Sequence, residues 1–324
     1  MPASLSRAHT HLSNAEALEL AQQAPTILRK NPKAISSSPL QFLFSSPESI
    51  ELWTIYENLL ISCLRTGDDD SALRCLERLV LRFGDQNERI MALKGLVKEA
   101  QASNHNELEA VLKEYNDILK ENAAIIPIAK RRVALLRSMG KAPEAITALT
   151  SLLDVSPTDA EAWAELGDLY LSQGLYAQAI FAIEEVLVLV PNAWNMHAKL
   201  GEVLLMAANQ GADAVPQKHL AEAVKRFSRS IELCDDYLRG YYGLKMATDK
   251  LLSEAGKPSK QVMDKEFHVP DTATLEKLNQ LATAKLGEMV RRNTAQEAGW
   301  QGYDASEITA AQELLAKSSS SVVR

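Results

Sequence analysis

The stretch from residue 160 to residue 192, AEAWAELGDLYLSQGLYAQAIFAIEEVLVLVPN, constrains the fold more than any other part of the chain. In its first half, Trp163, Leu166 and Tyr170 recur at helical spacing, which predicts an apolar stripe along one helix. Gly174 follows this stripe, and a residue that tolerates positive φ commonly ends a helix. The apolar pattern then resumes, so the stretch predicts two helices joined by a tight turn.

Small residues and a proline complete the pattern. Gly167 and Ala179 are small where the two helices must approach closely, because a bulky side chain there would clash. Pro191 cannot continue a helix and is expected to close the second one. The order W-x2-L-G-x2-Y, followed by Ala179, Ile183 and Pro191, is the signature of the tetratricopeptide repeat (TPR), a helix–turn–helix unit of 34 residues.

The unit recurs on both sides of this stretch. Thirty-four residues earlier, the turn glycine, the small residue and the closing proline return as Gly140, Ala145 and Pro157. Thirty-four residues later, Leu200 and Gly201 repeat the Leu-Gly pair of the first helix. Regular recurrence is much stronger evidence than one motif, and it predicts a solenoid of stacked helix pairs.

The unit that follows residue 192 is longer than the others. Ala223 and Phe227 lie 44 residues beyond their equivalents in the previous unit, so ten residues are inserted. The run 209–217 contains Gly, Ala and Pro, and we expect the insert there. Counting units from about Trp53 to Leu252, the sequence predicts an all-α, TPR-type solenoid of about five and a half repeats.

The rest of the chain is expected to flank this solenoid. Before it, a short helix with Ser13 as N-cap should bury Leu12, Ala15, Leu18 and Ala21. The apolar residues 40–44 either dock on the first repeat or contact a partner. A solenoid exposes the apolar face of its last unit, so capping helices should follow. The expected divisions are a tail, short helix and loop in 1–50, the solenoid in 51–252, a linker in 253–270, capping helices in 271–317 and a disordered tail in 318–324.

Composition restricts the class of function. A net charge of −7 with 24% charged residues argues against general nucleic-acid binding, which needs a basic face. Cys63, Cys75 and Cys234 form no C-x-x-C pair and are odd in number, which favours a reducing compartment. No apolar run reaches the roughly 18 residues that span a bilayer, and the N-terminus lacks an apolar signal core. We therefore expect the chain in the cytosol.

No catalytic, cofactor or metal motif stands out. The sequence contains no Gly-rich phosphate loop, H-E-x-x-H, G-x-S-x-G or zinc spacing of Cys and His. Asp68, at the start of a predicted helix, is interpreted as a cap with the two aspartates that follow it. Cys63 and Cys75 fall on apolar faces and are interpreted as buried thiols. We expect no catalytic residue, cofactor, metal or small-molecule substrate.

Charged residues on the first helices are the remaining candidates, because these helices line the concave face of a TPR groove. The basic run 130–132 is either a solvated face or a partner-binding patch. Lys130 and Lys199 could supply two cations of the clamp by which some TPR domains grip a carboxylate. However, Ala134 stands where that clamp has an asparagine, and Glu165 would repel a carboxylate, so we reject the clamp. The candidate partner-binding residues are Lys130, Arg131, Glu165 and Lys199.

Several stretches resemble one TPR family in particular. They are LWTIYE at 52–57, GDDDSALRCL at 67–76, AKRR at 129–132, EAWAEL at 161–166 and RGYYGL at 239–244. The chain resembles subunit 2 of the endoplasmic reticulum (ER) membrane protein complex, with loop insertions that suggest a fungal version. The resemblance covers roughly residues 12–289.

This resemblance implies a non-catalytic cytosolic scaffold. Such a subunit would hold cytosolic parts of membrane subunits 3 and 5, and a globular cytosolic subunit 8 or 9, in an insertase for tail-anchored and multi-pass proteins. It would attach to the ER membrane through these partners. Two other hypotheses stay open. A TPR adaptor of another assembly shares every compositional feature, and an enzyme would need a catalytic constellation that the sequence does not show.

Overall fold

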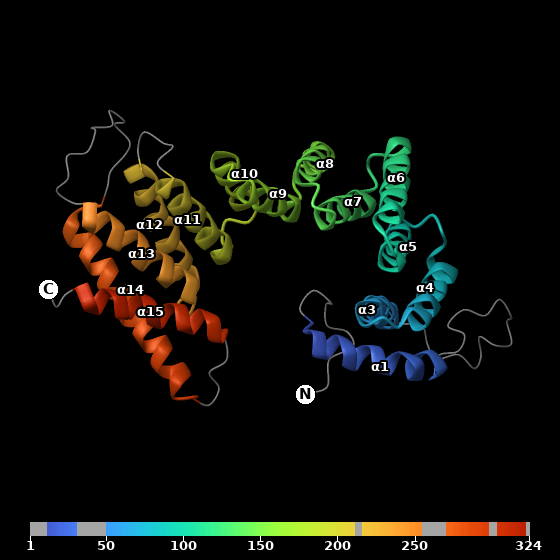
Figure 1. Cartoon of the computed structure of the whole chain (residues 1–324), viewed down its shortest axis with the longest axis horizontal. Coiled ribbons are helices and arrows are strands. Elements are labelled where there is room, and N and C mark those ends of the chain that lie inside the picture. Colours follow the sequence, from blue (N-terminus) through green and yellow to red (C-terminus); the bar gives the residue numbers. More distant parts are fainter. Residues whose placement is uncertain (1–11, 31–49, 211–215, 255–269, 298–302, 322–324) are drawn as a thin grey trace. The chain divides into compact units, whose positions relative to one another are not determined.

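A computed structural model describes residues 12–30, 50–210, 216–254, 270–297 and 303–321. Within these ranges the chain forms fourteen helices and no strand (Figure 1). The chain divides into two compact units, Met1–Pro157 and Thr158–Arg324, each with its own hydrophobic core. The all-α TPR fold predicted from the sequence is confirmed.

The first unit contains one leading helix and three helix pairs. The pairs are α3 with α4, α5 with α6, and α7 with α8, and α1 packs on α3. Their bounds are α1 Asn14–Lys30, α3 Ile50–Thr66, α4 Asp69–Phe83, α5 Glu88–Gln101, α6 His105–Glu121, α7 Ile126–Ser138 and α8 Ala142–Val155.

The second unit also contains three helix pairs, followed by one more helix. The pairs are α9 with α10, α11 with α12, and α13 with α14, and α15 packs on α14. Their bounds are α9 Ala160–Ser172, α10 Tyr176–Leu189, α11 Trp194–Asn209, α12 Pro216–Leu233, α13 Leu238–Glu254, α14 Thr272–Thr294 and α15 Ala305–Ser321.

Turn glycines set the helix–turn–helix geometry. Gly67, Gly140 and Gly174 have φ of 77°, 73° and 72°, a left-handed conformation that L side chains rarely adopt. Gly174 ends α9, and the next amide, Leu175 N, donates to the Tyr170 carbonyl at 2.9 Å. The chain can therefore reverse direction within three residues and begin α10.

A second set of glycines lets helices approach across a bulky side chain. A Cβ on Gly167 would lie 3.0 Å from Ile183 Cγ1. A Cβ on Gly201 would lie 2.8 Å from the Phe227 ring, and one on Gly243 would enter that same ring. Phe227, fully buried, is therefore held between α11 and α13 at two glycines that face it.

The first helix is longer than expected and buries only part of the predicted face. Ser13 caps it as predicted, because Ser13 Oγ accepts from Glu16 N at 3.2 Å while Ser13 N donates to Glu16 Oε2 at 2.8 Å. Of the four residues predicted to be buried, Leu12 and Ala21 are buried, whereas Ala15 and Leu18 are exposed. The predicted residues are three positions apart. Because an α-helix has 3.6 residues per turn, residues at this spacing move gradually around the helix and do not stay on one face. The buried residues of the helix lie three, four, seven and eleven positions after the first of them, which marks one face of a helix: Ala17, Leu20, Ala21, Ala24 and Leu28.

Most of the inserted residues extend helices and do not form a loop. Compared with the α9–α10 pair, α11 continues three residues further and α12 begins four residues earlier. Only three of the ten extra residues lengthen the connection itself, so 209–217 is not a loop throughout. The helices could absorb them because Pro216 is compatible with the first turn of a helix.

The C-terminal end also differs from the expectation. The helix α15 continues to Ser321, so residues 318–321 are helical where a disordered tail was predicted. No Gly or Pro interrupts the run of serines, and serine is tolerated in helices. Asp271 caps α14, accepting from Thr274 N at 3.3 Å. The predictions for 31–49 and for most of the linker 253–270 fall outside the described residues.

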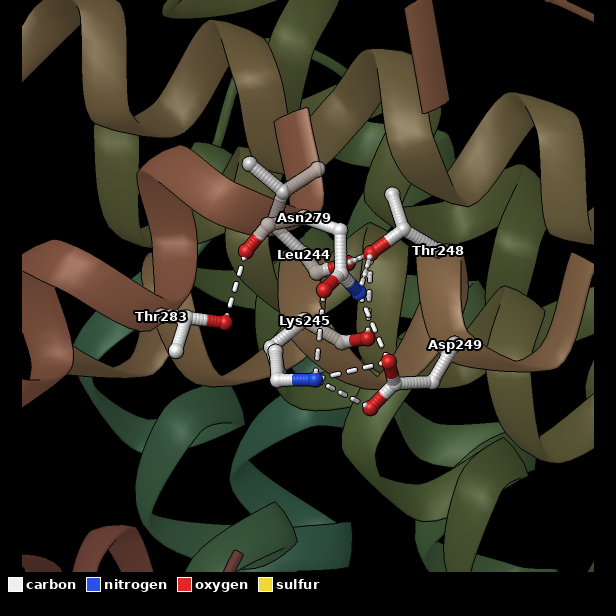
Figure 2. A network of polar contacts seen from close by, with 6 residues as sticks. All are labelled: Leu244, Lys245, Thr248, Asp249, Asn279 and Thr283. Atoms are coloured by element: carbon white, nitrogen blue, oxygen red, sulfur yellow. Dashed lines mark hydrogen bonds and ion pairs between the residues drawn. The ribbon is translucent and has the colours of Figure 1, made fainter. Parts of the chain in front are cut away.

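A buried polar network joins α13 to α14 (Figure 2). Lys245, only 3% exposed, donates to both oxygens of Asp249 at 2.7 and 2.8 Å and to Asn279 Oδ1 at 3.3 Å. Asn279 Nδ2 donates in turn to Thr248 Oγ1 at 2.9 Å and to Asp249 Oδ1 at 2.7 Å. Lys245 lies 44 residues after Gly201, in the same repeat position, so a lysine replaces the packing glycine here. The network satisfies the ammonium and fixes how α14 pairs with α13.

We predict that Gly243→Ala destabilises the protein by about 1–3 kcal/mol, because the new methyl group must displace the Phe227 ring. Gly287→Ala is the matched control: nothing lies within 4 Å of a Cβ there, and alanine stabilises a helix interior by up to about 1 kcal/mol. Chemical denaturation monitored by circular dichroism measures both. Equal stabilities for the two variants would contradict the close approach.

We further predict that Asn279→Ala costs about 1–3 kcal/mol, because it removes two donors and one acceptor from the network at once. Lys245→Met should lower the free energy of unfolding by less, since it removes the buried charge itself and leaves no ammonium that requires hydrogen-bond acceptors. The same denaturation experiment compares them. A larger loss in Lys245→Met would show that the ammonium itself makes a net contribution to stability.

Candidate partner-binding surface

Ion pairs connect the first helices of successive repeats. In the first unit, Arg89 on α5 pairs with Glu57 on α3 through both carboxylate oxygens, with Arg89 Nη2 2.7 Å from Glu57 Oε1. Arg131 on α7 pairs with Glu99 on α5. In both pairs the acid belongs to one repeat and the base to the next, 32 residues later. We refer to these two pairs, together with the pair of Asp168 and Lys199 in the second unit, as the first-helix ladder.

The Arg131 pair is part of a half-buried network. Arg131 Nε donates to Glu99 Oε1 at 3.2 Å, and Arg131 Nη2 donates to the other oxygen. The buried Tyr115 hydroxyl on α6 donates to Glu99 Oε1 at 2.5 Å. Burial, and then the hydrogen bond to Glu99, raises the pKa of Tyr115 above its usual range, so the phenol stays a donor. Arg131, predicted to bind a partner, is thus engaged inside the repeat stack.

The other residues of the basic run are also partly buried. Arg132 Nη1 lies 3.4 Å from Asn116 Oδ1, and burial lowers the pKa of the Arg132 guanidinium. Its Nε is buried without a hydrogen bond in the described residues. Lys130 is half-buried and takes part in a polar interaction within the protein. The run 130–132 is therefore not simply a solvated face.

The second unit has the corresponding pair. Lys199 on α11 lies 2.9 Å from Asp168 on α9, again with the acid in one repeat and the base in the next. Glu165, one turn before Asp168, is half-buried and also takes part in a polar interaction within the protein. Of the four predicted partner-binding residues, Arg131 and Lys199 therefore each belong to a pair of the ladder, one in each unit.

The signature residues of the repeat serve packing. Leu166, Gly167, Ala179 and Ile183 are buried, as is Ala145 in the preceding repeat. Trp163 is half-buried and contacts Phe181 edge to face, with ring centroids 6.0 Å apart. Tyr170 is half-buried at the edge of the second core. Gly140, Gly174, Pro157 and Pro191 lie in the turns between helices.

The histidine and cysteines that were considered for chemistry are structural. His197 is buried, with its Nε2 3.0 Å from the Pro191 carbonyl. Burial raises the pKa of the Cys63 and Cys75 thiols to about 12, which keeps them protonated at neutral pH. Asp68 caps α4 by accepting from Ser71 N at 3.1 Å. No cluster of three metal-binding side chains occurs among the residues that the structure describes.

An apolar groove lies between the first helices of the second unit and α15. We name it the α11–α13–α15 groove, with a volume of about 300 Å³. Met206 on α11 and Met246 on α13 are 43% and 40% exposed, and Tyr242 and Ala310 contribute further apolar wall. Exposed methionines at a groove are typical of surfaces that bind apolar segments, because the thioether is flexible and polarizable.

A single acid stands in this groove without a hydrogen bond. Glu202 on α11 would be the acid of the next pair in the ladder, and Arg239 on α13 lies near it. Arg239 instead pairs with Glu307 on α15, Nε to Oε1 at 2.9 Å. Burial raises the pKa of the Glu202 carboxyl above its usual range. Among the described residues, Glu202 forms no hydrogen bond or ion pair.

A second pocket lies at the start of the first unit, with a volume of about 590 Å³. Trp53 and Phe83 meet edge to face at 5.4 Å, and Arg82 lies over both rings. Leu79 and Ile90 form its floor. This pocket combines aromatic rings with a cation.

Sequence reasoning missed the groove residues. Glu202 and Met206 are four residues apart on α11, and Tyr242 and Met246 are four apart on α13, so each pair shares a helix face. That spacing was visible in the sequence. The contribution of α15 was not, because it depends on how this helix packs on α14 and on its ion pair with Arg239 of α13.

No helix in the described part of the chain is both long and apolar enough to span a membrane. The helix pairs and their repeat spacing define a TPR protein, a class that uses stacked helices as a binding surface. The family model for the EMC2 TPR-like repeat domain matches residues 79–218. The chain belongs to the family of subunit 2 of the ER membrane protein complex.

Relatives share most of the chain. The TPR repeat protein oca3 of Schizosaccharomyces pombe is 33% identical over 240 residues, which cover 72% of this chain and 82% of the relative. The ER membrane protein complex subunit 2-B of Xenopus laevis is 30% identical over 233 residues, covering 72% and 74%. Among solved structures, part of a TPR protein from Cytophaga hutchinsonii aligns with a TM-score of 0.49 at 14% identity, covering 92% of this chain and 99% of that one.

We predict that Arg131→Glu destabilises the protein by about 1–3 kcal/mol, because it places two carboxylates together in a half-buried site. Lys113→Glu, an exposed reversal on α6, should change stability by less than about 0.5 kcal/mol. Thermal unfolding measures both variants. The double variant Glu99→Arg with Arg131→Glu should recover part of the loss, and no recovery would contradict the pairing.

Proposed function

We propose that this protein is a non-catalytic scaffold subunit of the ER membrane protein complex. It lies on the cytosolic face of the ER membrane and attaches to the membrane through its partners. The observation that carries the proposal is membership of the subunit 2 family, since relatives named as that subunit align over 72% of this chain. Three helix pairs in each unit supply the long surface that scaffolding requires.

The partners proposed are cytosolic parts of membrane subunits 3 and 5 and a globular cytosolic subunit, 8 or 9. By holding these in one arrangement, the protein supports insertion of tail-anchored and multi-pass proteins. The first-helix ladder supports a scaffolding role, because its ion pairs keep the inner helices of each unit in fixed register. A rigid surface loses little conformational entropy when a partner segment binds.

We predict that the tagged chain, purified from native membranes in mild detergent, recovers multi-spanning subunits in one large complex. In sealed ER vesicles, added protease should digest the tag, because the protein lies on the cytosolic side. The matched control is Gly287→Ala, a variant without a steric conflict, which should recover the same subunits. Recovery only outside membranes, alone or with unrelated partners, would replace this proposal with a TPR adaptor of another assembly.

A further inference from the structure

The α11–α13–α15 groove departs from the regular first-helix ladder in a way that specifies a ligand. In the ladder, each acid on one first helix pairs with a base on the next: Glu57 with Arg89, Glu99 with Arg131, and Asp168 with Lys199. Glu202 continues this series on α11, but the nearby bases Lys199 and Arg239 already pair with other acids. Lys199 and Arg239 attract Glu202 electrostatically, but among the described residues no base forms an ion pair with it, so the last pair of the ladder is incomplete there.

We propose that this groove binds an amphipathic helical segment of a partner subunit, and that a Lys or Arg of the segment pairs with Glu202. The proposal rests on the proposed function, since it names the surface through which the scaffold holds one partner. Apolar side chains of the segment lie against Met206, Tyr242 and Met246. The basic side chain lies at the Glu202 end of the groove.

Charge complementarity decides in favour of a basic segment. A wholly apolar segment would cover Glu202 and leave a carboxylate without a partner, which is costly. An acidic segment would add repulsion from Glu202 and from Glu307, whose own base is already engaged. A basic side chain instead completes the pair, and a pair shielded by the methionines is stronger than one in water.

The geometry favours a helix. The groove has walls on three helices and a volume of about 300 Å³, which suits a few anchoring side chains from one face of a helix. Met206 and Met246 line it from neighbouring first helices, and α15 contributes the small side chain of Ala310. Helix-in-groove recognition uses apolar anchors at spacings of three and four, and a base one turn from an anchor can reach an acid at the groove edge.

The test is photo-crosslinking within the native complex. A photoreactive phenylalanine replaces Met246 in the full chain, and the matched control places it at Leu281 on α14. The two sites are similarly exposed, 40% and 44%, but Leu281 does not line the groove. The complex is purified after illumination, and crosslinked peptides are identified by mass spectrometry. The experiment is repeated with Glu202→Lys and with Glu202→Gln.

We expect an adduct at Met246, and none at Leu281, with one segment of a co-purifying subunit that carries a basic residue beside apolar residues at helical spacing. Glu202→Lys should lower the yield at least about tenfold, and Glu202→Gln should lower it less. Reversing the partner's basic residue to Glu should restore the yield in Glu202→Lys. Membrane subunits that co-purify without a Met246 adduct would overturn the groove proposal while the proposed function stands.

Other outcomes also decide between the hypotheses. An adduct with a lipid or with the chain itself, or with a segment that lacks a basic residue, would overturn the proposal. A yield that Glu202→Lys leaves unchanged would do the same. An adduct with a basic helical segment of a protein outside any membrane complex would support the groove chemistry and contradict the proposed function.

Discussion

Close approach of helices at glycine is the constraint on which the repeat stack depends. In the second unit the pairs meet where Gly167 faces Ile183 and where Gly201 and Gly243 face Phe227. Gly95 faces Tyr115 in the same manner in the first unit. A large side chain on the second helix fits because the facing position has no side chain. This contact sets the distance between helices, and the ion pairs can form only once that distance is set.

Electrostatics then fixes the register of neighbouring repeats. The Arg131–Glu99 pair is partly buried on both sides, so it contributes more than the more exposed pairs of the ladder, since exposed surface pairs typically add little. The last helix pair is held together by polar contacts, because Lys245 occupies the glycine position and its ammonium donates hydrogen bonds to Asp249 and Asn279. Residues 255–271 separate α13 from α14, so a specific polar network helps to select the correct pairing.

Much of the fold could be predicted because it depends on local sequence. The apolar spacing at Trp163, the turn at Gly174 and the closing Pro191 all act within 34 residues. The face of α1 was predicted only in part, since which residues are buried depends on docking against α3, where Arg65 donates to the Leu12 carbonyl at 3.2 Å. The insert was only partly predicted, because helix propensity and loop composition overlap near Pro216.

The binding surface was harder to predict, because charge on a helix does not reveal whether it is already paired. Arg131 and Lys199 were identified from the sequence, yet their partners Glu99 and Asp168 lie about one repeat earlier. Glu202 was not identified, since its significance depends on Arg239 being paired with α15.

Hydrogen–deuterium exchange tests the central claim, that the first-helix face of the repeats holds the partners. The chain alone is compared with the chain in the purified complex. The account predicts slower exchange on assembly in α11, α13 and α15, with little change on the outer side in α10 and α12. Protection confined to α10 and α12 would contradict it.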